Sequence, residues 1–270
     1  MSINRALLFS RFEFNRFLLS KRGLIALVCY LLLWSFLLIE IVSRSADLLR
    51  SSAFTDVIYP LLGEAGFEKL IEWSAPELVF YWVVAMLSFP LLAVFASADQ
   101  LCSDKARGTM RFLTLRATRF EILVGRFLGQ VCISACFILL SIFAVLVLVI
   151  YNGESSLSAS VMLCGKVFFH LLITVVPIIA FMTLINTFST SSKQTIVYFF
   201  LIILLVYITI GLIETYLISN VGHALLILPN VNWTARLQLG LSEFGTWGIP
   251  IIQTVIFLAF AQVQFARSAL

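Results

Sequence analysis

Histidine is scarce in this sequence, and its scarcity limits the catalysis that the chain could perform. Of the 270 residues only two are histidines, His170 and His223. An intramembrane serine protease needs a histidine base for its nucleophile, and neither histidine is matched by a serine in a Gly-x-Ser-x-Gly-like setting. The H-E-x-x-H pattern, which puts two zinc-binding imidazoles on one helix face, is absent as well. We therefore expect no catalytic residues and no metal site in this chain.

A nucleotide-binding loop is also missing from the sequence. No G-x-x-x-x-G-K-[ST] pattern, whose backbone amides cradle phosphates, occurs in it. The nearest approach is Gly165-Lys166, which is followed by Val167. We therefore expect this chain to bind no cofactor and to depend on another subunit for any work driven by ATP.

The densest group of charged side chains lies between residues 99 and 126, and it suits docking better than catalysis. A segment that alternates cations with apolar residues predicts a short amphipathic helix along a membrane face, apolar side toward the protein and cationic side toward lipid or a partner. The simpler alternative is a positively charged membrane anchor with no further role. The alternating residues are Arg107, Met110, Arg111, Phe112, Leu113, Leu115, Arg116 and Arg119.

Four polar residues near the ends of apolar segments are candidates for lining a transport conduit: Lys166, His170, Asn186 and Glu214. Ionisable groups at membrane depth are costly and therefore point to function. Lys166 and His170 are four residues apart, which puts them on one helix face. However, lysine and glutamate near a helix end can reach interfacial water, and asparagine commonly joins helices. Both interpretations stay open.

The elements that position these residues are apolar helices. The chain is 61% hydrophobic and 12% charged, with a mean hydropathy of +1.05. Soluble domains are about 45–50% apolar and about 25% charged. The composition predicts an all-α integral membrane protein and excludes a cytosolic one. A net charge of +4 is too small on such a chain to indicate a nucleic-acid partner.

Six segments are apolar over the length of about 20 residues that a bilayer requires. Most of the 18 Lys and Arg residues lie before the first segment and between the second and third. Because basic loops stay in the cytoplasm, both termini are predicted to be cytoplasmic. The six predicted spans are residues 23–42, 78–98, 127–151, 161–188, 196–215 and 247–265.

Residues 1–270 are predicted to form a single transmembrane domain with two sizeable segments on the outer side. The first is a large extracytoplasmic loop, residues 43–77, and the second covers residues 216–246. They either cap an exit path or dock a periplasmic accessory protein, since loops near a conduit tend to carry specificity, or they merely cover helix ends.

Two strings between the second and third spans resemble the hallmark of ABC-2 type permeases, the membrane subunits of export-class ABC transporters. Residues 104–109 read Asp-Lys-Ala-Arg-Gly-Thr, and residues 119–126 read Arg-Phe-Glu-Ile-Leu-Val-Gly-Arg. The usual pattern has Arg-Gly-Thr after an acidic residue, and later Pro-x-Ser-Arg-x-Glu-Ile before Gly-Lys. Here the proline is absent, Thr118 stands at the serine and Arg126 at the lysine.

The resemblance implies a permease in the bacterial cytoplasmic membrane, with an interfacial elbow helix in residues 1–22. Residues 99–121 would form a coupling helix that docks on a separate cytosolic ABC ATPase, which binds the ATP and Mg²⁺. Two ATPase copies would serve two permeases, either a homodimer or a pair of paralogues. The residues thus assigned to ATPase coupling are Asp104, Arg107, Gly108, Thr109, Arg111, Phe112, Leu113, Arg119 and Glu121.

The coupling residues have physical roles that fit this assignment. Gly108 permits a tight turn and Thr109 can cap the helix that follows. Arg107 or Arg111 can pair with carboxylates on the partner.

Gly125 and Gly129, one helical turn apart, favour close packing of the third span on a neighbour, which explains both glycines without a functional role. Two other readings of the whole chain stay open, an ATP-independent six-span transporter and an intramembrane enzyme or sensor.

Overall fold

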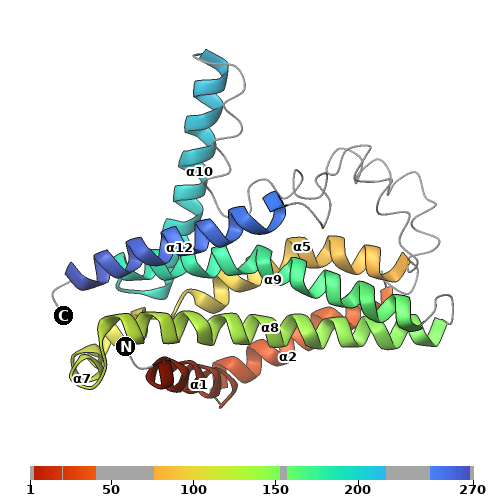
Figure 1. Ribbon diagram of the computed structural model, residues 1–270, viewed down its shortest axis with the longest axis horizontal. Helices are drawn as coiled ribbons and strands as arrows, with labels where there is room; N and C mark the ends of the chain where they lie inside the picture. Colours follow the sequence, from red (N-terminus) through yellow and green to blue (C-terminus); the bar gives the residue numbers. More distant parts are fainter. Residues whose placement is uncertain (1–2, 20, 41–75, 153–156, 217–243, 268–270) are drawn as a thin grey trace.

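A computed structural model describes residues 3–19, 21–40, 76–152, 157–216 and 244–267, and every regular element in these ranges is a helix. The predicted all-α class is therefore confirmed for this part of the chain. Four long helices lie lengthwise beside one another (Figure 1). They are α5 (Pro76–Ser97), α8 (Arg119–Asn152), α9 (Leu157–Phe188) and α12 (Phe244–Arg267).

Within the described residues, five helical stretches are long and apolar enough to cross a membrane. They coincide with the second to sixth predicted spans and include α10 (Ser192–Tyr216). The first predicted span coincides with α2 (Lys21–Glu40), which is not one of these five stretches. A multi-span helical membrane protein is thus confirmed, while the sixth crossing remains a prediction.

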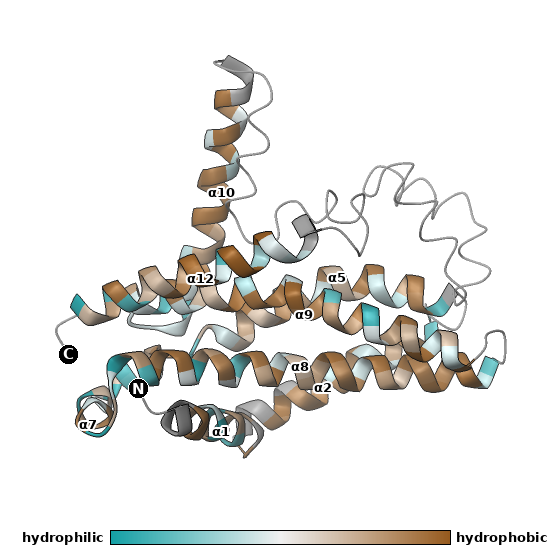
Figure 2. Ribbon diagram, in the orientation of Figure 1, coloured by the Kyte–Doolittle hydropathy of each residue, from teal (hydrophilic) through white to brown (hydrophobic). Residues whose placement is uncertain are grey.

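Helix α8 is longer than a bilayer requires. Its 34 residues extend for about 50 Å, whereas the hydrocarbon core is about 30 Å thick. The helix begins at Arg119, two turns before the predicted span, and Figure 2 shows hydrophilic residues on α7 and at the start of α8, whereas the middle of α8 is hydrophobic. These first turns therefore belong with the coupling segment and not with the apolar span.

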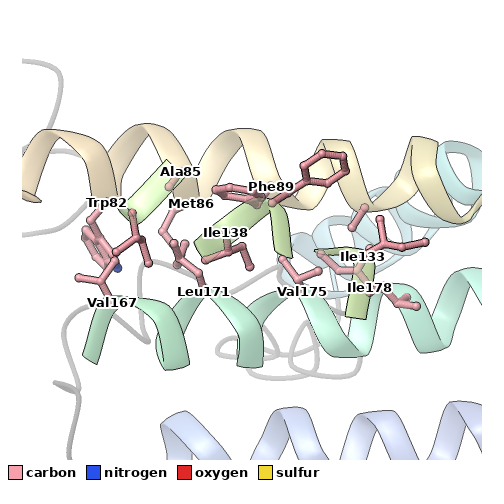
Figure 3. Packing of buried hydrophobic residues seen from close by; sticks show 14 of the residues in the cluster. Trp82, Ala85, Met86, Phe89, Ile133, Ile138, Val167, Leu171, Val175 and Ile178 are labelled. Atoms are coloured by element: carbon pink, nitrogen blue, oxygen red, sulfur yellow. The ribbon is translucent and has the colours of Figure 1, made fainter. Parts of the chain in front are cut away.

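The apolar core is built where α5, α8 and α9 meet. Figure 3 shows Trp82, Met86 and Phe89 of α5 facing Val167, Leu171 and Val175 of α9, together with Ile133 and Ile138 of α8. Their close packing maximises dispersion contacts, which hold helices together where lipid removes most of the hydrophobic advantage. Nearly solvent-free members are Ala85, Met86 and Phe89 of α5, Ile133 and Ile138 of α8, and Val167, Leu171, Val175 and Ile178 of α9.

Two hydroxyl contacts cross this core. Tyr30 donates to the carbonyl of Phe137 over 2.6 Å, and the hydroxyls of Tyr81 and Ser141 lie 2.8 Å apart. Because lipid offers no water to satisfy a polar group, each bond avoids an unpaired donor at membrane depth. The bonds also tie α2 and α5 to the same stretch of α8.

Helix α1 (Ile3–Leu19) crosses α8 steeply, so that Figure 1 shows it nearly end-on. The close approach depends on Gly129, because a Cβ there would lie 2.7 Å from the Cβ of Glu13 and 3.2 Å from the carbonyl oxygen of Ser10. Further along, the rings of Phe17 and Phe137 meet edge to face at 5.8 Å. The absence of a side chain at Gly129 therefore permits the close approach of α1 to α8.

Helix α10 leaves the end of α9 and projects away from the other long helices (Figure 1). Most of its apolar side chains are exposed, among them Leu204 and Leu205. Such a helix requires lipid or another subunit around it. The outer segments predicted for residues 43–77 and 216–246 lie almost entirely outside the described residues.

Candidate functional site

The predicted coupling segment forms two short helices and not one amphipathic helix. Five-residue helices α6 (Cys102–Ala106) and α7 (Met110–Thr114) are separated by a turn at Gly108. Gly108 has a φ of +69°, a left-handed conformation that costs other residues about 1–2 kcal/mol. The chain reverses there because glycine has no Cβ to strain the turn.

A capping box then starts α8. The backbone N–H of Thr118 donates to Oε2 of Glu121 over 3.0 Å, and the backbone N–H of Glu121 lies 3.3 Å from the Thr118 hydroxyl. This reciprocal pair satisfies two amides that a helix start leaves without intrahelical partners. Glu121, which we expected to serve ATPase coupling, is only 2% exposed. Its observed contacts begin the helix that carries the site.

Buried charges join three elements behind this turn. Arg126 of α8 is 2% exposed, donates from Nη1 to Oε2 of Glu13 over 2.8 Å, and contacts Asp104 of α6 through Nη2. Arg16 lies 3.7 Å from Glu13 and 3.6 Å from Asp104. Two bases thus balance two acids, which offsets part of the cost of removing these charges from water. We call Glu13, Arg16, Asp104 and Arg126 the ionic cluster.

Burial is the main influence on the pKa of Glu13, the acid that α1 contributes to the ionic cluster. It raises the pKa of Glu13 above the ordinary value, and the neighbouring Arg126 and Arg16 guanidinium groups oppose part of that rise. A carboxylate placed here is therefore costly without its arginine partners. The ionic cluster depends on all its members at once.

Thr109 differs from its expected role. It occupies the N-cap position of α7, but its side chain makes no capping hydrogen bond. Its hydroxyl lies 3.2 Å from both the carbonyl oxygen and Oδ1 of Asp104. A threonine hydroxyl can serve a nearby backbone or carboxylate oxygen in place of a helix amide. Thr109 therefore closes the Gly108 turn back onto α6 and the ionic cluster.

Lys105 fastens α6 to the end of α9. Its ammonium group donates to the carbonyls of Asn186 and Thr187 over 2.7 Å each, and to that of Ser189 over 3.3 Å. The last carbonyls of a helix lack intrahelical partners and lie at the negative end of its dipole. One cation thus caps α9 and ties it to the coupling segment.

Arg119 makes an equivalent connection to α12. Its Nη1 donates to the carbonyls of Phe265 and Ala266 over 2.7 Å each, and its guanidinium lies 5.9 Å from the Phe265 ring centroid. The start of α8 is therefore bound to the last turn of α12. This side chain, expected to face a partner, has contacts within its own chain.

An apolar cluster complements these polar connections. Met110 of α7 is 1% exposed and inserts among side chains from the turn before α6, the start of α8 and the end of α12. Burial of a methionine contributes about 1.5–3 kcal/mol. The cluster comprises Leu101, Met110, Leu123, Ala261 and Phe265, with Leu113 packed against it.

The outer face of the coupling segment remains exposed. Phe112 is 72% and Leu115 is 83% exposed, contrary to the expectation that the apolar residues of this stretch would all face the protein. The side chains of Arg107 and Arg111 are also exposed. Since exposed aromatic and arginine side chains are the usual anchors of protein interfaces, this face is suited to a partner.

The four conduit candidates are distributed differently. His170 is buried and its Nδ1 accepts a hydrogen bond from Nε1 of Trp82 over 3.2 Å, whereas Lys166 is exposed. Asn186 is buried and donates to the carbonyls of Ser97 and Met182. The side chain of Glu214 lies outside the described residues. Lys166 and His170 therefore do not lie in the same environment, although both belong to α9. Asn186 joins α9 to α5.

Sequence reasoning missed three residues that hold the site together. Arg126 of α8 contacts both Glu13 of α1 and Asp104 of the coupling segment, and Lys105 of the coupling segment contacts the end of α9. The sequence contains one indication of this site, because Arg126 is a charged residue inside an otherwise apolar helix. Gly125 beside it is also buried.

Comparison with known proteins identifies the kind of membrane protein that this fold and segment form. No protein of curated function matches the chain. The sequence model of the ABC-2 family transporter protein matches residues 10–270, which includes the ionic cluster, the coupling segment and all five long apolar stretches. The resemblance seen in residues 104–126 is thereby confirmed over nearly the whole chain, and this multi-pass membrane protein belongs to the ABC-2 transporter family as a permease.

Proposed function

We propose that this permease is the conduit-forming subunit of an ATP-driven exporter and is coupled to a separate ATPase through residues 99–121. The observation that carries the proposal is the division of this segment into two faces. Its inner face is anchored by Met110 and Lys105, while Arg111 and Phe112 are exposed on the outer one. A segment that is anchored on its inner face and exposes aromatic and cationic side chains on its outer face can transmit a movement of a bound partner to the membrane helices.

The proposed partner is a cytosolic ABC ATPase that carries the phosphate loop missing from this chain and binds ATP and Mg²⁺ there. Membership of the ABC-2 family supports a partner of this kind. The bias of Lys and Arg toward the segments around residues 1–22 and 99–126 supports a cytoplasmic position for both. In a bacterium this corresponds to the inner membrane, with both termini inside.

Two permease subunits are proposed to enclose the conduit between them, each served by one ATPase. The exposed apolar surface of α10 supports a second subunit, since one chain buries little of that helix. Whether the second subunit is an identical copy or a paralogue is decided by the mass of the purified complex. A complex containing one permease chain would overturn the paired arrangement.

Coupling is tested by co-purification of the tagged permease with the ATPase. The double variant R111E/F112A is expected to lower the recovered ATPase by about tenfold or more, because it removes an anchor and reverses a charge. Both side chains are exposed, so the unfolding temperature should not change. K193E, a charge reversal at another exposed residue next to the end of α9, serves as the matched control.

A transport assay provides a second test of ATP-driven coupling. Transport into inverted vesicles is expected to require both the ATPase and ATP, and to fall in R111E/F112A. Full transport by the permease alone, driven by an ion gradient, would contradict the proposal and favour an ATP-independent transporter.

A further inference from the structure

The coupling segment is continuous in the chain with two of the four long helices. Helix α5 leads into α6, and α7 leads into α8, so a movement of the segment reaches α5 and α8 along the backbone. Helices α9 and α12 lie elsewhere in the sequence. Lys105 is 82 positions from Thr187, and Arg119 is 146 positions from Phe265. These two helices therefore depend on noncovalent contacts to follow the segment.

The coupling segment makes the same kind of contact with both of these helices. Lys105 donates over 2.7 Å to the carbonyl oxygens of Asn186 and Thr187 at the end of α9. Arg119 donates over the same distance to two carbonyl oxygens in the last turn of α12. The last carbonyls of a helix have no intrahelical partner. One cation on either side of α7 thus holds the end of a different long helix.

Charged hydrogen bonds of this kind transmit a displacement better than apolar packing does. The apolar cluster around Met110 also touches α12, but dispersion and hydrophobic contacts have no preferred direction, so packed surfaces can slide. A hydrogen bond weakens steeply as its angle narrows, and an ionised donor makes it stronger. A cation placed on two carbonyls therefore resists a shift of the segment along the helix as well as away from it.

Helices α9 and α12 pack together as a pair. They lie side by side in Figure 1, and the ring centroids of Phe181 and Phe257 are 5.0 Å apart. Near the held ends, Leu184 of α9 packs against a cluster that contains the fully buried Ala261 and Phe265 of α12. Displacing both ends together keeps this close packing, whereas displacing one end alone would shear it.

We propose that Lys105 and Arg119 are positioning residues that make α9 and α12 follow the coupling segment when a bound ATPase moves it. The inference deepens the proposed function and rests on it for the source of the movement. Lys105 transmits the movement to α9, and Arg119 transmits it to α12. The segment thereby acts on four long helices at once, on α5 and α8 through the backbone and on the other two through these cations.

The coupling segment keeps other anchors when one of the cations is removed. Asp104 remains joined to Arg126, and Met110 remains buried in its cluster. The thiol of Cys102 lies 3.1 Å from Oδ1 of Asn186, a neutral contact that is weaker than one made by a cation. The neutral variants K105M and R119Q should therefore fold and present the outer face of the segment unchanged.

Hydrogen exchange of the purified permease–ATPase complex, measured by mass spectrometry, tests the proposal. Exchange is compared between the nucleotide-free complex and the complex arrested with ATP and vanadate. In the wild type the arrest should change exchange in residues 99–121, 183–189 and 261–267. In K105M the change at residues 183–189 should fall about threefold while that at residues 261–267 is kept, and R119Q should give the reverse.

The controls separate the role of each cation from a general effect of substitution. K105R should respond as the wild type does, because it keeps a cation that can donate to the same carbonyls. K193Q and R11Q neutralise an exposed lysine and an exposed arginine outside the coupling segment, and they should also respond as the wild type does.

The same variants are measured in the permease alone, since both contacts lie within one chain. There K105M should raise exchange about threefold at residues 183–189, because the last turn of α9 loses the cation on its carbonyls. R119Q should raise it by a similar factor at residues 261–267 and leave the end of α9 unchanged.

The outcomes distinguish this inference from the proposed function. If the end of α9 responded equally to the arrest in K105M and in the wild type, Lys105 would not transmit the movement, although coupling would stand. Equal responses of the end of α12 in R119Q would exclude Arg119 in the same way. If the arrest left residues 99–121 unchanged in the wild type, ATPase coupling would be wrong, and the exchange of the permease alone would show the two cations to be static anchors.

Discussion

Arg126 and Glu13 lie 113 positions apart in the chain and are joined by a 2.8 Å hydrogen bond between buried groups. The bond connects the start of α8 to α1, and the same arginine contacts Asp104 beside the Gly108 turn. With Arg16 the four side chains carry no net formal charge. This neutral cluster lies at the junction of the three elements that present the coupling face.

Replacing Arg126 by methionine should be severely destabilising. R126M keeps most of the side-chain volume but leaves the buried carboxylate of Glu13 and the half-buried one of Asp104 with only the partly exposed Arg16. Removing one partner of a buried pair costs about 3–5 kcal/mol. A fall of several degrees in the unfolding temperature of the detergent-solubilised protein is the expected result. R111M, at an exposed arginine, is the control and should unfold as the wild type does.

The triple variant E13Q/D104N/R126M distinguishes lost charge balance from lost packing. It removes the buried charges together, so most of the stability lost in R126M should return. If the triple variant were as unstable as R126M, the charges would not be the cause.

The stability contributed by Glu13 should depend on pH. Burial raises its pKa in the folded protein, so ionisation favours unfolding. Its contribution is present in full below the ordinary pKa of a glutamate, about 4.3, and is lost as the pH rises through the raised value. The neutral variant E13Q should therefore gain stability relative to the wild type as the pH rises over this window. Unfolding temperatures of both proteins across the window check this, and parallel curves would refute it.

Substitution of Gly108 should act through backbone conformation alone. A Cβ at this residue would meet no atom within 4 Å, but its φ of +69° strains any other residue type. G108A should therefore cost about 1–2 kcal/mol, and G108N less, since asparagine tolerates this region. Gly165 in α9 is the control, because its Cβ would also meet open space while its backbone is helical. G165A should be neutral or stabilising by up to about 1 kcal/mol.

Substitution of Gly129 should act by steric conflict. The added methyl group of G129A would lie 2.7 Å from the Cβ of Glu13, which forces α1 away from α8. Overpacking of this kind costs about 1–3 kcal/mol. The unfolding temperature of G129A should therefore fall by several degrees below that of the wild type. An unchanged unfolding temperature would mean that α1 does not pack against Gly129.

The apolar helices could be predicted from the sequence because a membrane imposes a minimum length of apolar residues on each span. Helices α8 and α9 begin before their predicted spans, since hydropathy locates the span within the bilayer and not the end of the helix. The turn at Gly108 was also predictable, because it follows from one residue type.

The inner contacts of the site could not be predicted in the same way. The pairing of Glu13 with Arg126 depends on how α1 crosses α8, which no local pattern encodes. Helix α7 has only five residues, which are too few for helical periodicity to show that Met110 is buried and Phe112 is exposed. Phe9 and Phe12 lie off the main apolar face of α1 in the sequence, and only the structure shows that they line a groove.

The ionic cluster also has a consequence for biosynthesis. Both carboxylates that neutralise Arg126 precede it in the chain, so Glu13 and Asp104 have already left the ribosome when the arginine emerges. Membrane proteins are built from the N-terminal end, and a lone arginine is expensive to bring near the bilayer interior. The order of these residues means that both partners are already present when Arg126, which directly precedes the apolar span of α8, emerges.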